Sequence, residues 1–229
     1  MSTVEKNITT VREIIAERAL KSGRQASDVR LMAVTKQVDD ERILDAVKAG
    51  IRIIGENYIQ EGKRKYDLIG PRVEWHMIGH LQKNKAKYAV QFVDMIHSVD
   101  RFDLAKEIDR RAAAADRTMK ILIEVNISGE QSKSGVAAEA TLELVRRVSS
   151  LPALSIQGLM TMPPWSSDPE DARPYFRSLR LLRDRISEEE IPGVEMRELS
   201  MGMTDDYPVA VEEGATIVRI GRAIFGSRA

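Results

Sequence analysis

Short apolar segments rich in β-branched residues alternate with longer amphipathic segments along the whole chain. The short segments have the length and composition of strands, and the longer ones repeat apolar residues at helical spacing. We expect eight strands, at residues 31–35, 51–54, 73–78, 95–97, 120–126, 155–161, 195–199 and 216–220. Helices are expected between them, at 39–49, 59–68, 83–90, 101–115, 137–151, 169–186 and 206–213, and one more at 4–21 precedes the first strand.

Strict alternation of strand and helix predicts parallel strands joined by right-handed crossovers. Two α/β architectures have this order, a closed (β/α)8 TIM barrel and an open doubly wound sheet. The count of eight strands favours the barrel, as does the absence of a GxGxxG motif after the first strand. The sequence has no internal repeat and no linker, so we expect a single domain over residues 1–229 with an additional N-terminal helix.

Composition narrows the class of protein. The 35 basic and 35 acidic residues give a formal net charge of zero, which argues against nucleic acid or an anionic membrane as the main partner. The absence of cysteine excludes disulfides and thiolate chemistry. The first 20 residues do not resemble a signal peptide, and no apolar run is long enough to cross a membrane. We expect a cytoplasmic protein.

Polar and glycine residues gather after the predicted strands, at the end of a barrel where function is found. The motif "SMGMTDD" follows the seventh strand, and "RIGRAIFG" spans the end of the eighth. Loops at these two positions commonly bind a phosphate. Within the first motif, Thr204 is expected to cap the next helix, with Asp205 and Asp206 complementing its positive end.

Lys36 stands at the end of the first strand, in "LMAVTKQ". At such a position a lysine either extends to water or is partly desolvated, which lowers the pKa of its amine and makes it nucleophilic. A nucleophilic lysine can form a Schiff base with a carbonyl compound. Together with a phosphate site on the same rim, Lys36 indicates either pyridoxal 5'-phosphate (PLP) or a sugar-phosphate aldolase without a cofactor.

Arg219 lies in the otherwise apolar strand "TIVRIG" and shares a face with Gly221. A charge inside a barrel needs a partner. A carboxylate such as Glu56 or Glu124 would serve, and so would the ring nitrogen of a cofactor.

His76 and His80 are four residues apart in "HMIGH", a spacing that on a helix would suggest a metal site. The segment is predicted as strand and turn, so no metal is expected. The lysines at 83–87 are interpreted as a solvated face.

Six segments in register resemble the pyridoxal phosphate homeostasis protein family: "MAVTKQ", "GENYIQEGKRK", "EWHMIGHLQKNKAK", "VNISGEQSKSGV", "GLMTMPP" and "ELSMGMTDDYPVAVEEGATIVRIGRAIFG". The resemblance covers residues 31–226 and implies a fold type III PLP barrel, similar to the barrel domain of alanine racemase. It implies that Lys36 holds PLP as a Schiff base, that Asn57 lies beside it and that Arg219 contacts the pyridine nitrogen. The phosphate would be held by Ser200, Gly202, Met203, Thr204, Gly221 and Arg222, although an arginine at 222 departs from the small or hydroxyl residue expected there.

The resemblance implies a function in vitamin B6 homeostasis, in which the protein binds PLP, keeps the free aldehyde scarce and delivers it to PLP-dependent apoenzymes. An arginine beside the ring nitrogen makes the ring a poorer electron sink. We also expect no second domain of the kind from which alanine racemase draws an acid/base group. We therefore expect a binding protein and not an enzyme, most simply a monomer. An amino-acid racemase-like enzyme remains the alternative.

Overall fold

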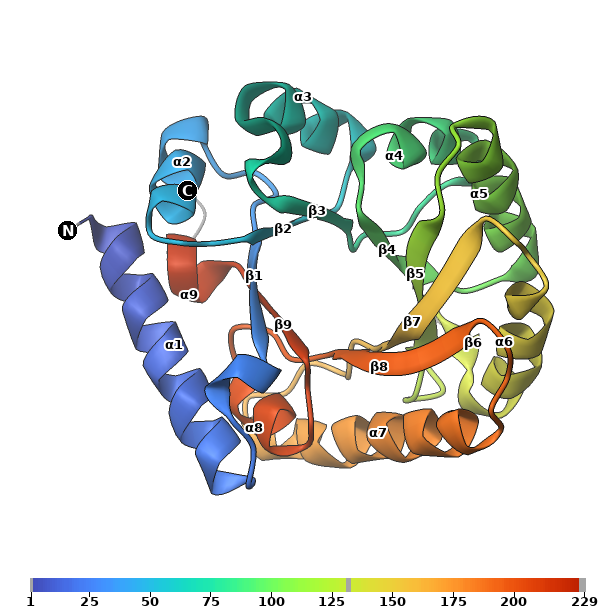
Figure 1. Ribbon diagram of the computed structural model, residues 1–229. Coiled ribbons are helices and arrows are strands. Elements are labelled where there is room, and N and C mark those ends of the chain that lie inside the picture. Colours follow the sequence, from blue (N-terminus) through green and yellow to red (C-terminus); the bar gives the residue numbers. More distant parts are fainter. Residues whose placement is uncertain (1, 131–132, 227–229) are drawn as a thin grey trace.

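The structure, a computed structural model, describes residues 2–130 and 133–226. Eight parallel strands form a ring: β1 (Arg30–Val34), β2 (Ile53–Glu56), β3 (Glu74–Met77), β4 (Met95–Val99), β5 (Met119–Asn126), β7 (Leu154–Met160), β8 (Val194–Ser200) and β9 (Ile217–Ile220). The ring is closed because β9 pairs with β1 and β4 pairs with β5 (Figure 1). The predicted (β/α)8 barrel is confirmed.

Helices surround this ring on the outside (Figure 1). They are α1 (Thr3–Lys21), α2 (Asp40–Lys48), α3 (Ile59–Ile69), α4 (Ala86–Phe92), α5 (Phe102–Ala114), α6 (Thr141–Ser149), α7 (Arg173–Glu188), α8 (Tyr207–Glu212) and α9 (Arg222–Phe225). Short 3-10 turns occupy Ala26–Asp28, Gly70–Arg72, Lys83–Lys85, Ala138–Ala140 and Pro169–Ala172. Over the residues described, no helix has both the length and the apolar character needed to cross a membrane.

The predicted N-terminal helix is present as α1. Its apolar residues recur every three or four positions, which places them on one face. That face is buried, through Val4, Ile8, Val11, Ile15 and Ala19. It packs against α2, α8 and α9 (Figure 1). The helix therefore covers the wall of the barrel near β1, which Lys36 follows, and β9, which carries Arg219.

Local details differ from the sequence prediction where short turns precede helices. The helix expected at 83–90 is a 3-10 turn followed by α4. The helix expected at 137–151 begins with a two-residue strand, β6 (Val136–Ala137), which pairs with the end of β5, and then a 3-10 turn. The four-residue α9 was not predicted. In each case the deviation is too short to change the apolar periodicity of the segment.

The expected helix cap at Thr204 is wrong. Helix α8 begins after Asp206, and the Thr204 hydroxyl instead accepts a hydrogen bond from the Ala223 N–H at 3.2 Å. Asp206 bends the preceding segment, because its carboxylate accepts from the Met203 N–H at 2.6 Å. Thr204 is therefore bonded to the start of α9 and not to its own helix, which joins the two segments expected to bind phosphate.

The barrel interior is divided into an apolar and a polar part. Side chains from six strands form an apolar cluster of Met32, Ile53, Met95, Leu122, Met160 and Ile217. His76, His97, Ser200 and Arg219 are buried beside it. The polar part adjoins the carboxyl ends of the strands through Arg219, which also lines the cavity described next.

Candidate functional site

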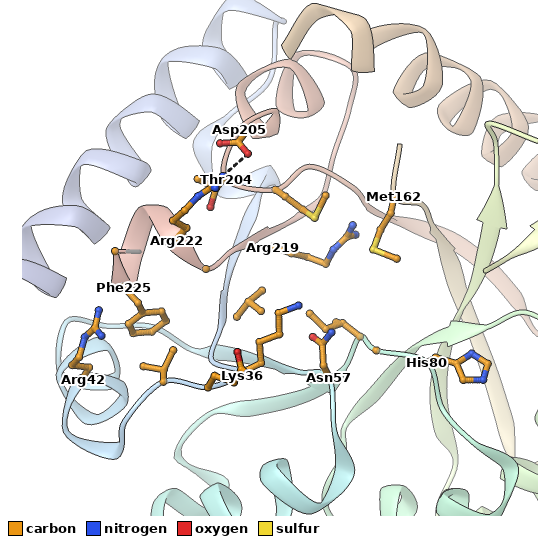
Figure 2. A pocket seen from close by; sticks show the side chains of 18 of the residues that line it. Lys36, Arg42, Asn57, His80, Met162, Thr204, Asp205, Arg219, Arg222 and Phe225 are labelled. Atoms are coloured by element: carbon orange, nitrogen blue, oxygen red, sulfur yellow. Dashed lines mark hydrogen bonds and ion pairs between the residues drawn. The ribbon is translucent and has the colours of Figure 1, made fainter. Parts of the chain in front are cut away.

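A cavity of about 1070 Å³ opens at the carboxyl ends of the barrel strands. Its walls come from the segments at or after β1, β2, β3, β5, β7, β8 and β9. Seven of the nine predicted site residues line it: Lys36, Asn57, Met203, Thr204, Arg219, Gly221 and Arg222. Figure 2 labels five of them, Lys36, Asn57, Thr204, Arg219 and Arg222.

Lys36 follows β1 and is half-buried, with its amino group pointing toward the space between Arg219 and Asn57 (Figure 2). Its backbone is held on both sides. The carbonyl oxygen of Thr35 accepts from the Lys65 amine at 2.6 Å, and the N–H of Gln37 donates to the Glu61 carboxylate at 2.7 Å. Gln37 has a φ of 59°, in the left-handed region. The strand end is thus fixed in a turn that aims Lys36 into the cavity.

The clamp on this turn is a buried cluster centred on Lys65, whose side chain is fully buried. Its amine donates to Glu56 at 2.8 Å and to Glu61 at 2.7 Å. Burial raises the pKa of Glu56, opposed by the charge of Lys65. Burial also acts to raise the pKa of Glu61, but hydrogen bonds from Lys65 and the backbone hold that pKa below its ordinary value. The alternative that Glu56 pairs with Arg219 is therefore wrong.

Asn57 follows β2 and faces the cavity (Figure 2). Among the described residues its Oδ1 atom is buried without a hydrogen-bond partner. The loop after β3 approaches it closely at Gly79, where an added Cβ would lie 2.4 Å from the Asn57 carbonyl oxygen. Only glycine permits this approach. A buried polar atom without a partner is costly, so Oδ1 is a candidate ligand contact.

Arg219 projects from β9 with its side chain buried (Figure 2). One terminal nitrogen, Nη1, donates to the carbonyl oxygen and the hydroxyl of Ser200 at 2.6 and 2.8 Å. The other, Nη2, donates to the carbonyl oxygen of Thr161 at 2.9 Å. Burial lowers the pKa of Arg219 to about 10, opposed by the charges of Asp206 and Glu124, so the side chain stays charged at neutral pH.

These bonds use only part of the donor capacity of Arg219. A guanidinium carries five N–H groups, and the three bonds above occupy three of them. Within residues 2–130 and 133–226, the N–H on Nε and one N–H on Nη2 have no hydrogen-bond acceptor. Since Arg219 lines the cavity, a ligand there can accept from this side chain without displacing a protein contact.

Ser200 and Gly202 do not line the cavity. Ser200 is fully buried and contacts Arg219. Gly202 has a φ of 90°, and an added Cβ would lie 2.5 Å from the Cβ of Ala210 in α8. Its carbonyl oxygen accepts from the N–H of Arg219 at 2.9 Å. Direct phosphate contact by these two residues stays a prediction, and their observed contacts support Arg219 and the turn before α8.

Arg222 lies at the cavity mouth, and its guanidinium pairs with the carboxylate of Asp205 (Figure 2). Both side chains are more than half exposed. This ion pair and the bond between Thr204 and Ala223 both join the loop after β8 to the start of α9. The departure from the family pattern at 222 thus gives a side chain that braces the rim, leaving the backbone at Gly221 beside the cavity.

Three residues that shape the cavity were not among the predicted site residues, although Glu124 was considered as a partner of Arg219. Glu124 faces the cavity from β5, and burial raises its pKa to about 7, helped by Asp100 and opposed by Arg219. Arg42 and Phe225 form one wall, with the guanidinium 5.9 Å from the ring centroid (Figure 2). The sequence indicated that Glu124 faces the barrel interior, because it shares the inward face of its strand with Leu122. Arg42 and Phe225 lie on helices, and no such pattern indicated them.

His76 and His80, which were not expected to form a metal site, lie in different environments. His76 is buried inside the barrel on β3, while His80 is exposed on the rim and lines the cavity. The two do not share a helical face, as expected from strand and turn.

The site presents an amine, a charged guanidinium, an unpaired amide oxygen and two braced loops within one cavity. Such a set can bind a carbonyl compound that also carries an anionic group and an acceptor atom.

Three comparisons with known proteins agree. Residues 7–229 match the family model "Alanine racemase, N-terminal domain". The chain is 44% identical over 224 residues to a protein of Aquifex aeolicus called pyridoxal phosphate homeostasis protein, covering 97% of each chain.

Solved structures show the same fold. PipY of Synechococcus elongatus PCC7942, solved with PLP bound, is 36% identical and has a TM-score of 0.81, covering 93% of this chain and 100% of its own. Alanine racemase of Clostridium difficile 630 has a TM-score of 0.77 at 11% identity, covering 99% of this chain and 57% of the racemase. At that identity the likeness shows the fold alone.

Proposed function

Since the chain belongs to the pyridoxal phosphate homeostasis protein family, we propose that it binds PLP in the barrel cavity, covalently through Lys36, and serves vitamin B6 homeostasis. The single observation that carries this proposal is the placement of the Lys36 amine and the Arg219 guanidinium in one cavity, from neighbouring strands. The PLP-bound structure of PipY supports it, as the relative is similar over nearly the whole chain.

The residues present fit the cofactor. When bound, PLP supplies an aldehyde that bonds to a primary amine with loss of water, on an aromatic ring that carries an acceptor nitrogen and a phosphate. Lys36 offers the amine. Arg219 offers an N–H to an acceptor nitrogen and, because it stays charged, does not give up its proton to that atom. Asn57, with its unpaired oxygen, is proposed to lie beside the ring.

The phosphate is proposed to bind between the loops after β8 and β9, at residues 203–204 and 221–222. The Thr204 hydroxyl accepts from the Ala223 N–H and so retains its own proton for donation. Gly221 lines the cavity beside these residues, and an added Cβ there would be in ordinary contact with Val34 at 3.5 Å or more. Ser200 and Gly202 contribute by fixing Arg219 and the turn.

We further propose that the protein is a cytoplasmic, monomeric carrier of PLP and not an enzyme. A protonated ring nitrogen favours carbanion chemistry, and a charged arginine beside that nitrogen does not favour its protonation, so carbanion chemistry is less favoured here. The role of carrier predicts transfer of PLP to apoenzymes.

Uptake of PLP tests the binding proposal. The purified protein is mixed with PLP, passed through a desalting column and scanned for visible absorption, beside Lys36→Ala and Lys83→Ala. Wild type and the Lys83 variant, altered only on the exposed surface, should retain PLP, whereas Lys36→Ala should lose most of it. Equal retention by Lys36→Ala would refute the assignment of Lys36.

Turnover separates a carrier from a racemase-like enzyme. The PLP-loaded protein is incubated with L- or D-alanine, and both enantiomers are measured by chiral chromatography. The proposal expects no interconversion above that of free PLP, and turnover that Lys36→Ala abolishes would establish the racemase-like alternative.

Light scattering should give a mass near 25.7 kDa for a monomer.

A further inference from the structure

A chain of hydrogen bonds runs through the barrel interior from the cavity toward the opposite end. Arg219 Nη1 lies 2.8 Å from Ser200 Oγ, which lies 2.9 Å from Nδ1 of His97. Nε2 of His97 lies 2.9 Å from Nδ1 of His76, whose Nε2 lies 3.3 Å from a carboxylate oxygen of Glu74. The five residues come from β9, β8, β4 and β3, and Glu74 is the first residue of its strand.

The two ends fix the direction of every proton in this chain. Arg219 can only donate, and the ionised Glu74 carboxylate can only accept. A hydrogen bond from His76 holds the pKa of Glu74 below its ordinary value, so the carboxylate is charged at neutral pH. Ser200 therefore accepts from Arg219 and donates to Nδ1 of His97.

The protonated nitrogen of each histidine ring follows from the same two ends of the chain. His97, accepting at Nδ1, donates from Nε2 to Nδ1 of His76, and His76 donates from Nε2 to Glu74. The reverse arrangement would set the lone pair of His76 Nε2 against the Glu74 carboxylate. It would also make the Ser200 hydroxyl accept from both Arg219 and His97, which leaves its own proton without an acceptor in the chain. Both rings are thus neutral, with the proton on Nε2.

Burial keeps the two rings neutral. Both are fully enclosed, and burial lowers the pKa of His76 and brings that of His97 well below its ordinary value. The charge that His76 would carry if protonated and the charge of Arg219 lower the pKa of His97 further. A positive charge on His97 would be repelled by the buried guanidinium of Arg219, which is two hydrogen bonds away along the chain. Neutrality is also what allows each ring to accept from the preceding member.

We propose that Ser200, His97 and His76 are positioning residues that orient Arg219 through this one-way hydrogen-bond chain anchored at Glu74. The chain holds Nη1 toward the interior, so that the N–H groups on Nε and Nη2 stay available to the cavity. The proposed ligand of those groups, the ring nitrogen of PLP, rests on the proposed function above. The chain itself consists only of the protein's own side chains.

The direction of donation has a chemical consequence. Every proton along the chain is donated away from the cavity, so the chain supplies no acid to an acceptor atom bound at Arg219. Arg219 is held as a hydrogen-bond donor and not as a proton donor, which suits a site that binds its ligand without activating it as an electron sink.

The tautomers can be measured directly in the PLP-free protein. Protein labelled with ¹⁵N-histidine is examined by long-range ¹H–¹⁵N correlation at neutral pH. The protein has three histidines, and exposed His80 serves as the internal reference. His76 and His97 should both give the pattern of a neutral ring protonated at Nε2. A proton on Nδ1 of either ring, or a charged ring, would overturn the proposed direction.

Two variants of His97 test the positioning role, because this residue does not line the cavity. His97→Leu removes the acceptor of the Ser200 hydroxyl and should raise the dissociation constant for PLP by roughly 10-fold. His97→Asn offers an amide oxygen near the position of Nδ1 and should recover most of the affinity, to within about 3-fold of wild type. Urea unfolding monitors the stability of both variants.

The outcomes are distinct. Wild-type affinity in His97→Leu, or equal loss in both variants, would refute positioning through this acceptor. If the wild type itself binds no PLP, the proposed function fails, while the tautomer measurement still decides whether the chain runs as proposed.

Discussion

Replacing Glu124 by glutamine tests the electrostatics of the cavity through the stability of the fold. The Glu124 side chain projects from β5 into the cavity and is only 3% exposed. Burial is the main cause that raises its pKa from 4.5 to about 7, with a smaller contribution from Asp100 and an opposing one from Arg219. Glutamine keeps the shape of the side chain and removes the charge.

The magnitude follows from linkage between protonation and folding. A carboxyl group whose pKa is raised in the folded state stabilises the fold below its unfolded pKa, and this contribution is lost as pH rises through the folded pKa. For Glu124 the window runs from 4.5 to about 7. One pKa unit is worth about 1.4 kcal/mol, so the full loss is about 3 kcal/mol, most of it between about pH 5 and pH 8.

The assay is urea unfolding of the PLP-free protein at about pH 5 and about pH 8. Glu124→Gln should be more stable than wild type at the higher pH, and this advantage should exceed that at the lower pH by about 2–3 kcal/mol. Glu139→Gln, at an exposed position, is the control and should show no such difference. An equal effect of Glu124→Gln at both pH values would refute the assignment of a raised pKa to Glu124.

Three further substitutions test the supports of the site by urea unfolding. Lys65→Met leaves Glu56 buried without its cation and should destabilise the fold by about 3–5 kcal/mol. Lys63→Met removes an exposed ion pair and should cost less than about 1 kcal/mol. Similar costs for the two variants would contradict the buried cluster. Gly202→Ala combines a φ of 90° with a Cβ clash and should cost about 2 kcal/mol or more, so a neutral effect would show that the turn relaxes. Arg222→Ala breaks only an exposed pair and should cost less than about 1 kcal/mol, and a larger loss would mean that this pair is essential to the rim.

The barrel could be predicted because its strands are short β-branched runs that alternate with amphipathic helices. This pattern depends on local sequence, and parallel order follows from it. The same order placed Lys36 on the rim shared by the carboxyl ends of all barrel strands, and Arg219 was expected inside the barrel. The cavity between them confirms that placement.

Contacts that depend on the three-dimensional register were not predictable. His97 and Ser200 are 103 residues apart and meet across the barrel, which no local pattern indicates. Ser200 was therefore assigned to a ligand, although its hydroxyl faces two protein groups. The cap expected at Thr204 was wrong for the same reason, because its partner, Ala223, lies in α9, after the next strand.

Reduction with borohydride tests the central claim most directly, since it converts a reversible link between PLP and a lysine into a stable one. Protein loaded with PLP is reduced, digested and analysed by mass spectrometry. The account predicts loss of the visible absorption and a pyridoxyl group on the peptide that contains Lys36. A modification spread over exposed lysines with Lys36 unmodified would contradict it.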